Sequence, residues 1–396
     1  MHLELQWAMF IPLTFWALHR AVDAPTYRRG ALAGVCLALQ LFACVYYGAF
    51  LSIALVVFVP LLIACSARGR VRGVIPIVAT AAGVAVLLSI PFAVPYVLAS
   101  RDLGGRAAEE VARYSATVPS YFATSSLNLL WGWTGDRWGS AELRLFPGVV
   151  ALLLALVSLA WRPGRHVLLY AATAALAVEL SFGLNGTLYR VLFSHVDALQ
   201  GFRSVARFAI IASAALAVLA GFGSMRLFDA LPTRRTRSLT LAVLLSLITV
   251  EGLNRPQPLT PAPPVEPPAA YQVIRSAAPG ALLELPLPDL KRLPGNEPDY
   301  QLWSMWHWKP LVNGYSGYYP ADYLMTVIRM SVFPGEGTLD RLRAHDVRYV
   351  IVHRAFYDRE DYTRLMLRIA SEPQLKPWGA YRDTVGTADI FELMPR

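Results

Sequence analysis

Long apolar runs fill residues 5–254 and limit what this chain can fold into more than any other feature. A helix that crosses a lipid bilayer needs about 20 predominantly apolar residues. The whole chain is 55% hydrophobic and 16% charged, whereas soluble domains average about 45–50% and about 25%. The sequence therefore predicts an α-helical polytopic membrane protein of GT-C-like architecture, with about eight transmembrane helices within residues 1–255. The predicted spans lie near 5–19, 31–46, 49–66, 74–98, 146–161, 166–182, 208–225 and 238–254.

Arginine clusters between the apolar runs predict the orientation of the helices. The clusters are Arg20/Arg28/Arg29, Arg68/Arg70/Arg72, Arg162/Arg165 and Arg226/Arg234/Arg235/Arg237. Loops rich in basic residues stay in the cytoplasm. The first two clusters share that side only if the chain between them crosses twice, with a tight turn at Tyr46-Tyr47-Gly48. This topology places the loop 99–145, the segment 183–207 and everything after residue 255 outside, together with Met1.

The start of the chain is unusual for this topology. The first apolar run begins within five residues of Met1, and no basic segment precedes it to hold the amino terminus outside. We therefore hypothesise that the sequence is the carboxy-terminal portion of a longer membrane protein whose earlier helices are missing. An in-frame stop codon immediately upstream of Met1 would contradict this hypothesis.

Net charge and cysteine usage exclude two other classes of protein. The formal charge is +9, but the basic residues form no stripe interleaved with aromatics, so we expect no nucleic-acid partner. Only three of the 36 basic residues are lysine, which indicates GC-rich coding and a bacterial source. Cys36, Cys44 and Cys65 lie inside apolar runs, a pattern that predicts neither a disulfide framework nor a cysteine-based metal site.

Residues 256–396 have the composition of an ordinary globular segment. The proline-dense sequence PQPLTPAPPVEPP at 256–268 predicts an extended, semi-rigid linker. Beyond the linker, β-branched and apolar runs predict strands, and helical spacing predicts helices. The sequence thus predicts a small periplasmic α/β domain over residues 269–396. Its expected strands are 281–287, 347–353 and 388–393, and its expected helices are 321–332, 338–345 and 359–371.

Two arginines in the outer segment GFRSVARF at 201–208 are candidate phosphate ligands. Arg203 and Arg207 are four residues apart at the outer end of the seventh predicted span, where they would share one helix face. Two guanidinium groups on the side away from the basic loops can grip a phosphate bidentately. The alternatives are that they extend to lipid headgroups or pair with an acid of an outer loop.

The outer loop 99–145 combines carboxylates with aromatic rings. Glu109, Asp136 and Glu142 accompany Trp138 and further aromatic residues in this loop. Such a combination is typical of a sugar site, in which the acid binds hydroxyls or acts as a base and the ring covers a sugar face. Anchoring at the membrane–water interface is the alternative for an aromatic-rich loop.

The segment HWKPLVNGYSGYYP at 307–320 predicts a second site for a sugar or acceptor. His307, Asn313, Tyr315 and Tyr318 lie in it beside two turn glycines, which imply a tight loop that presents polar and aromatic side chains together. The alternative is that this loop docks the carboxy-terminal domain onto the helices.

Other ionisable residues give weaker indications. Glu179 lies within an apolar run, where it is either functional or paired with Arg190 or Arg203. The remaining histidines, His353 among them, are isolated, so a divalent metal cofactor has no visible site and the cofactor stays unknown. Motifs for nucleotide hydrolysis, serine hydrolysis and zinc proteolysis do not occur in the sequence.

Several segments, taken in order, carry a resemblance to a known group of proteins. They are HLELQWAMFIPLTFWALHR, ALAGVCLALQLFACVYYGAF, AELRLFPG, GFRSVARF, ELPLP and HWKPLVNGYSGYYP before VRYVIVH. This succession resembles bacterial GT-C-type integral membrane glycosyltransferases and YfhO-like membrane proteins over nearly the whole chain, in architecture and loose motifs. The resemblance implies transfer of a sugar, with inversion, from a polyprenyl-phosphate carrier at the outer membrane face. It also implies a catalytic acid in the first outer loop.

That first outer loop has no counterpart in this sequence. The chain starts immediately before a helix, where Glu4 is the only acidic residue, in agreement with a missing amino-terminal part. We carry over only phosphate recognition by outer-face arginines, at Arg203 and Arg207, and leave the catalytic residue unknown.

Three functions remain open at this point. The leading one is hexosyl or pentosyl transfer in envelope glycan assembly, in the bacterial cytoplasmic membrane, with membrane lipids and a polyprenyl-phosphate-linked sugar as partners. The second is a transporter or flippase for lipid-linked sugar, which would need paired charges deep within broken helices. The third is a non-catalytic scaffold whose periplasmic domain binds a partner.

Overall fold

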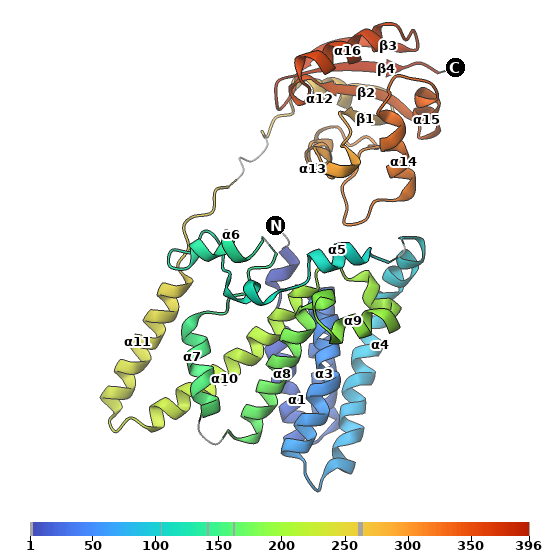
Figure 1. The fold of residues 1–396 in the computed structure, drawn as a ribbon. Coiled ribbons are helices and arrows are strands. Elements are labelled where there is room, and N and C mark those ends of the chain that lie inside the picture. Colours follow the sequence, from blue (N-terminus) through green and yellow to red (C-terminus); the bar gives the residue numbers. More distant parts are fainter. Residues whose placement is uncertain (1–2, 104, 141, 161–162, 260–263, 396) are drawn as a thin grey trace. The chain divides into compact units, whose positions relative to one another are not determined.

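The computed structural model describes residues 3–103, 105–140, 142–160, 163–259 and 264–395. The chain forms two compact units, Met1–Pro258 and Leu259–Arg396, which we call unit 1 and unit 2. Unit 1 is helical, and unit 2 contains a small sheet (Figure 1). The expectation of a mostly helical protein with a small carboxy-terminal α/β fold is confirmed at this level.

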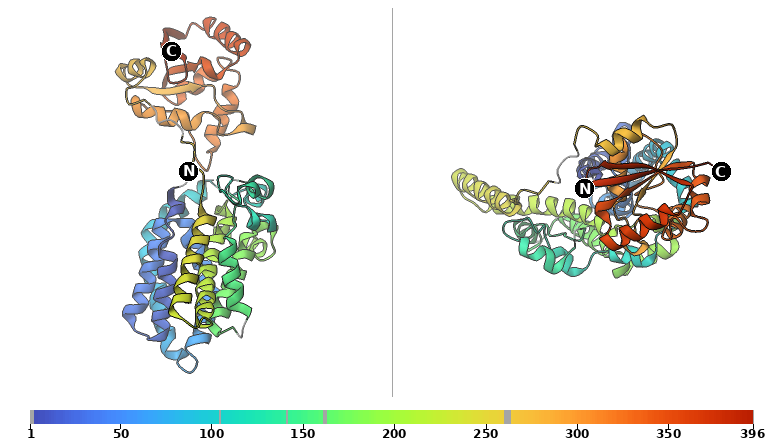
Figure 2. Two further views of the ribbon diagram at one scale, coloured as in Figure 1. Left: turned by 90° about the vertical axis from the view of Figure 1, so that its left-hand side faces the viewer. Right: turned by 90° about the horizontal axis from the view of Figure 1, so that it is seen from above.

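Most of the long helices of unit 1 run side by side, whereas the last of them stands apart from the rest (Figures 1 and 2). A helix lies in each range where the sequence predicted a span: α1 (Phe10–Asp23), α2 (Tyr27–Ala43), α3 (Val45–Ser66), α4 (Val71–Leu103), α7 (Val149–Ala160), α8 (Arg165–Ser181), α10 (Ala209–Asp229) and α11 (Arg234–Gly252). Among the described residues, three helices are long and apolar enough to cross a membrane. They are α3, α4 over Val71–Ala99, and α10 with the turn before it, over Val205–Asp229. Unit 1 therefore has the character of a membrane protein.

Shorter elements fill the segments between these helices. They are α5 (Ala108–Arg113) and α6 (Gly135–Trp138) between α4 and α7, and α9 (Leu188–His195) between α8 and α10. Turns of 3-10 helix lie among them.

Glycines allow two pairs of helices in unit 1 to approach closely. A Cβ atom on Gly30 or Gly34 of α2 would lie only 2.4 Å from the Ile77 carbonyl oxygen or 2.3 Å from that of Ala81, both on α4. A Cβ on Gly223 of α10 would lie 1.8 Å from a carbonyl oxygen of α7. Apolar side chains gain little by leaving lipid for a protein interior, so contact between helices depends on small residues of this kind.

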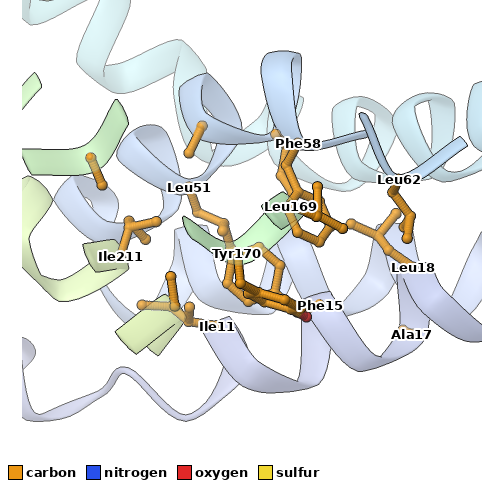
Figure 3. Packing of buried hydrophobic residues seen from close by; sticks show 14 of the residues in the cluster. Ile11, Phe15, Ala17, Leu18, Leu51, Phe58, Leu62, Leu169, Tyr170 and Ile211 are labelled. Atoms are coloured by element: carbon orange, nitrogen blue, oxygen red, sulfur yellow. The ribbon is translucent and has the colours of Figure 1, made fainter. Parts of the chain in front are cut away.

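Aromatic side chains form the centre of the core that joins α1, α3 and α8 (Figure 3). Phe15 of α1 lies 4.7 Å from Phe58 of α3, measured between ring centroids, and both rings contact Tyr170 of α8. Offset and edge-to-face arrangements of this kind are the favoured ones for aromatic rings. This core holds α3 in place, and Tyr46 near the start of α3 belongs to the candidate site.

The boundaries of the first helices correct two predictions. The turn between α2 and α3 lies at Cys44, whose backbone is extended (φ −156°, ψ 110°), and not at Tyr46-Tyr47-Gly48. One extended residue suffices to reverse the chain, because Gly48 lets α3 pack directly against Leu41. Tyr46 is thereby inside a helix and turns towards the candidate site. The first helix begins at Phe10 rather than near residue 5, since Leu3–Gln6 forms a 3-10 turn.

Unit 2 is built on a four-stranded sheet with the order β1-β2-β4-β3. The strands are β1 (Ala281–Leu285), β2 (Val347–His353), β3 (Leu375–Arg382) and β4 (Thr387–Leu393). β1 pairs with β2 in parallel, and the other two pairings are antiparallel. The helices are α12 (Ala269–Ser276), α13 (Glu297–Trp303), α14 (Ala321–Met330), α15 (Thr338–Ala344) and α16 (Arg359–Ala370).

Apolar cores cover both faces of this sheet. Leu283 and Val350 belong to one core, and Leu282 and Ile351 belong to the other. Because successive side chains of a strand point to opposite faces, strands buried on both faces read as continuous apolar runs. An ionisable residue inside such a strand must therefore be buried.

Candidate functional site

Arg203 and Arg207 precede α10 rather than lying on it. Arg207 belongs to a 3-10 helix, Val205–Phe208, and Arg203 lies in the bend before it. The prediction that the two share one helix face is therefore wrong, because the chain is not α-helical here. Both guanidinium groups nevertheless reach the same carboxylate, that of Glu142 in the loop 99–145.

Glu142 connects the two arginines. Its Oε1 lies 3.7 Å from a terminal nitrogen of Arg203, and its Oε2 lies 3.2 Å from one of Arg207. Oε2 also accepts a hydrogen bond of 2.5 Å from the buried Ser204 hydroxyl. Arg203 further lies 3.9 Å from Glu110. Pairing with loop acids, which the sequence left open as an alternative, is thus the arrangement in this structure.

We call this group the arginine–carboxylate cluster and define it as Arg106, Glu110, Glu142, Arg203 and Arg207. Arg106, just before α5, donates to Glu110 in the first turn of that helix over 3.3 Å. Three guanidinium groups against two carboxylates leave the cluster with a formal charge of +1. The Arg207 side chain is only 10% exposed and that of Arg203 only 24%, so these charges interact more strongly than they would at a fully solvated surface.

Tyrosine rings form the walls of the cluster. The Arg203 guanidinium lies 4.6 Å from the centre of the Tyr114 ring, and that of Arg207 lies 4.8 Å from the Tyr46 ring. The Tyr46 hydroxyl also accepts from the backbone N–H of Arg203 over 3.3 Å. Stacking over an aromatic face holds a guanidinium in place while its N–H edge stays available.

Backbone hydrogen bonds between loops bring these residues together. Ala206 N–H donates to the Tyr114 carbonyl over 3.1 Å, and Arg106 N–H donates to that of Gln200 over 2.9 Å. These bonds join the loop after α4 to the segment before α10. The cluster therefore depends on contacts between segments about a hundred residues apart, which no local sequence pattern could specify.

The other acids proposed for the outer loop lie apart from this cluster. Glu109 is exposed on α5. Asp136 pairs with Arg144 at 2.7 Å, and Trp138 packs against Trp133. Glu142 is therefore the one acid of the predicted set of three that the described structure brings to the arginines.

Glu179 has a different partner from the one expected. Its carboxylate accepts from the backbone N–H groups of Thr187 and Leu188, at 3.0 and 3.2 Å, and from the Thr187 hydroxyl. It therefore caps the start of α9. The expected pairing with Arg190 or Arg203 is replaced by this cap, while Arg190 donates to the Leu184 carbonyl.

The predicted loop 307–320 of unit 2 does not present its polar side chains together. Tyr315 is 48% exposed and Tyr318 is half-buried, but His307 and Asn313 are buried. Asn313 bonds both backbone groups of Glu284, accepting over 2.7 Å and donating over 2.8 Å. The Asn313 side chain thus pairs with the free backbone edge of β1, as a neighbouring strand would. It points inward for this reason.

A buried charge network in unit 2 is the site that the sequence did not predict. His353 lies between two carboxylates, with Nε2 at 2.7 Å from Glu284 and Nδ1 at 2.7 Å from Asp383. Tyr271 of α12 donates to the same Glu284 oxygen over 2.8 Å. Burial by itself would lower the pKa of His353, but the hydrogen bonds to Asp383 and Glu284 outweigh it and raise the pKa to about 9. The imidazolium therefore balances part of the carboxylate charge.

A second buried carboxyl in unit 2 gives a pH-dependent prediction. Burial raises the pKa of Glu297 from 4.5 to about 7, although Asn313 and Gly314 donate hydrogen bonds to it. Between these pH values the folded state keeps a proton that the unfolded state releases. The contribution to stability is therefore complete below pH 4.5 and is lost as the pH rises towards 7, by about 3 kcal/mol.

The variant Glu297→Gln isolates this effect. We expect the unfolding free energy of wild type to fall by about 3 kcal/mol relative to that of the variant from pH 4.5 to pH 7, measured by hydrogen exchange of the slow amides of β1 and β2 in the whole protein. His307, whose pKa burial and Lys309 lower to about 4, acts in the opposite direction, but it is common to both proteins and cancels. Parallel pH profiles for the two proteins would contradict the prediction.

The described residues were compared with the arrangements that bind metal ions, and the sequence with those of known proteins. Within the described ranges, no group of three or more histidine, cysteine, aspartate or glutamate side chains is arranged to hold a metal ion. The fold and the cluster define a helical protein with membrane-length helices and a partly buried basic group in the loops at one end of them. Neither the models of known protein families nor the sequences of characterised proteins give a match to this chain.

Proposed function

We propose that this chain is a GT-C-type membrane glycosyltransferase that uses a polyprenyl-phosphate-linked sugar in bacterial envelope glycan assembly. The observation that carries the proposal is the convergence of Arg203 and Arg207 on one carboxylate between two tyrosine rings. We assign binding of the carrier phosphate, rather than the chemical step, to these two arginines.

The chemistry of the cluster suits a phosphate. The planar guanidinium fork matches the oxygens of a phosphate as well as those of a carboxylate, and such charge-assisted bonds are about twice as strong as neutral ones. Glu142 therefore occupies the position that a phosphate oxygen would take. The two tyrosines hold the guanidinium groups when that carboxylate moves away.

The proposal also includes an orientation in the cytoplasmic membrane. In it, all eight long helices of unit 1 cross the bilayer, and the amino terminus and unit 2 lie outside. Arg70 before α4, Arg165 at the start of α8 and Arg226 near the end of α10 lie at the helix ends opposite to the cluster. Basic residues mark the cytoplasmic ends of spans, which leaves the cluster at the periplasmic face, where lipid-linked sugars are used.

Binding of a polyprenyl phosphate to the whole protein in nanodiscs tests this assignment. We expect Arg203→Ala and Arg207→Ala each to weaken binding at least roughly tenfold, because each removes a charge-assisted pair worth about 1.5–3 kcal/mol. Arg207→Lys should recover only part of the loss, since lysine keeps the charge but lacks the fork.

Two controls separate phosphate recognition from other effects. Arg190→Ala removes an exposed arginine from the same outer segment, one that donates to a backbone carbonyl, and should leave binding unchanged. The uncharged polyprenol should bind wild type and variants alike. Equal affinity of the polyprenyl phosphate for wild type, Arg203→Ala and Arg207→Ala would refute the proposal.

A further inference from the structure

The loop between α5 and α7 carries exposed aromatic side chains that contact one another. Trp133 is 58% exposed and Phe122 is 55% exposed, and the half-exposed Trp138 lies between them. The ring centroids of Trp133 and Trp138 are 5.3 Å apart, and those of Phe122 and Trp138 are 6.4 Å apart. We call these three side chains the aromatic patch. Leu129 and Leu130 extend it with further exposed apolar surface.

The backbone under the patch is held firmly. The side-chain oxygen of the buried Asn128 accepts from the N–H groups of Leu130 and Trp131, at 3.0 and 2.8 Å. Its amide nitrogen donates to the Glu251 carbonyl over 2.7 Å. The Thr134 hydroxyl connects two further points of the loop. These hydrogen bonds fix the loop backbone, and the aromatic side chains of the patch are exposed in this fixed conformation.

Hydrogen bonds place this loop at the ends of four helices of unit 1. It bonds to Ser181 at the end of α8, to Ala206 just before α10 and to Leu253 just after α11. The Glu251 carboxylate near the end of α11 accepts from the N–H of Val149 at the start of α7, over 2.7 Å. Figure 1 accordingly draws α6 beside the same end of α7 and α11.

Exposed apolar side chains also lie on α11, which the loop reaches through the bond from Leu129 to Leu253. α11 has no buried residue among those described and exposes Leu247, Ile248 and Val250 in its last turns. α10, whose start lies under the same loop, is one of the helices long enough to cross a membrane. Where an apolar span ends, the surrounding solvent changes from hydrocarbon to lipid headgroups.

We propose that the aromatic patch is an interfacial anchor that lies in the headgroup layer of the lipid bilayer. Tryptophan concentrates at this depth because one part of its ring is apolar and its N–H can bond to headgroups or water. Arg137, whose guanidinium lies 5.7 Å from the Trp138 ring centre, supplies a cation beside the rings that suits lipid phosphates. The inference rests on the embedding of unit 1 in a membrane and is independent of the phosphate site of the cluster.

Spin labels on the whole protein in phosphatidylcholine nanodiscs test this inference. After Cys36, Cys44 and Cys65 are replaced by serine, a nitroxide is attached at Trp133→Cys and its collisions with oxygen and with a water-soluble nickel complex are measured. We expect values between those of two reference sites, the exposed Glu109→Cys and the apolar helix position Leu245→Cys. A label at 133 that matches position 109 would overturn the proposal, as would a label shielded from both reagents, which indicates a protein partner.

A second measurement needs no cysteine replacement. Lipids brominated near the headgroup quench tryptophans at that depth. We expect the double variant Trp133→Phe/Trp138→Phe to lose part of the quenching that wild type shows, whereas Trp308→Phe, which removes the most exposed tryptophan of unit 2, should not. Unchanged quenching in the double variant would contradict the proposal. The Arg207→Ala variant, expected to lose affinity for polyprenyl phosphate, should give the same spin-label and quenching results as wild type. The phosphate-site proposal and the anchor proposal can therefore be refuted independently.

Discussion

Replacement of His353 by glutamine is expected to lower the unfolding free energy of unit 2 by about 3–5 kcal/mol, the range for removing one partner of a buried ion pair. The reason is that Glu284 and Asp383, each 2.7 Å from the ring in the native protein, would remain buried without a cation. Hydrogen exchange of the β1, β2 and β4 amides in the whole protein, at neutral pH, measures the loss.

Two further variants identify the cause of that loss. His345→Gln removes a histidine that pairs with Asp322 at the surface of the same unit, and such exposed pairs contribute about 0–1 kcal/mol. Glu284→Gln added to His353→Gln should restore part of the stability, because it removes one of the uncompensated charges. If His353→Gln is no more harmful than His345→Gln, the network carries no buried charge pair.

The pH dependence of the wild-type protein follows from the same pair. The pKa of His353 is raised from 6.5 to about 9 in the folded state. A group with a raised pKa stabilises the fold fully below its unfolded pKa, and the contribution disappears as the pH rises through the folded value. The variant His353→Gln should therefore differ most from wild type below pH 6.5 and least above pH 9.

The apolar patterns of unit 2 predicted three of its strands, but not the fourth. β1, β2 and β4 are largely buried and consist mainly of apolar and β-branched residues. β3 is the edge strand, with the sequence LKPWGAYR and mostly exposed side chains. Pro377 and Gly379 accompany a shift in its register, and both residues are rare in central strands. This segment is a strand because it pairs with β4. The local sequence pattern does not predict that pairing.

The candidate sites likewise combine features that the local sequence predicts with features that depend on the tertiary fold. Two arginines at close spacing indicated an anion site, and the structure brings them to one carboxylate. The choice of Glu142 over Glu109 or Asp136 depends on how the loop 99–145 folds back towards the start of α10, which spacing along the chain does not specify. Glu284 is the one charged residue of β1, and His353 follows the apolar run Val350–Val352 of β2, so this pattern could have marked both as buried ionisable residues. The contact between Glu284 and His353 depends on β1 lying beside β2, which the sequence alone does not show.

Replacement of Glu142 by glutamine is expected to strengthen binding of polyprenyl phosphate, in contrast to the arginine variants. The carboxylate competes with the phosphate for Arg203 and Arg207. Glutamine keeps the size of the side chain and still accepts from Ser204, but it raises the formal charge of the cluster from +1 to +2. One unit charge at such distances is worth about 1–4 kcal/mol at or near a protein surface, so an affinity gain of roughly tenfold is a conservative expectation.

A purely structural cluster predicts a different outcome for the same variant. If Glu142 only holds the loop to the start of α10, Glu142→Gln lowers thermal stability and leaves the affinity for polyprenyl phosphate unchanged. Asp136→Asn is the matched control, because Asp136 also pairs with an arginine of this loop, Arg144, at 2.7 Å. Binding titrations in nanodiscs at several salt concentrations separate the two cases. An electrostatic gain should decrease as salt screens the extra charge, and a reduced or unchanged affinity of Glu142→Gln would mean that no phosphate takes the place of this carboxylate.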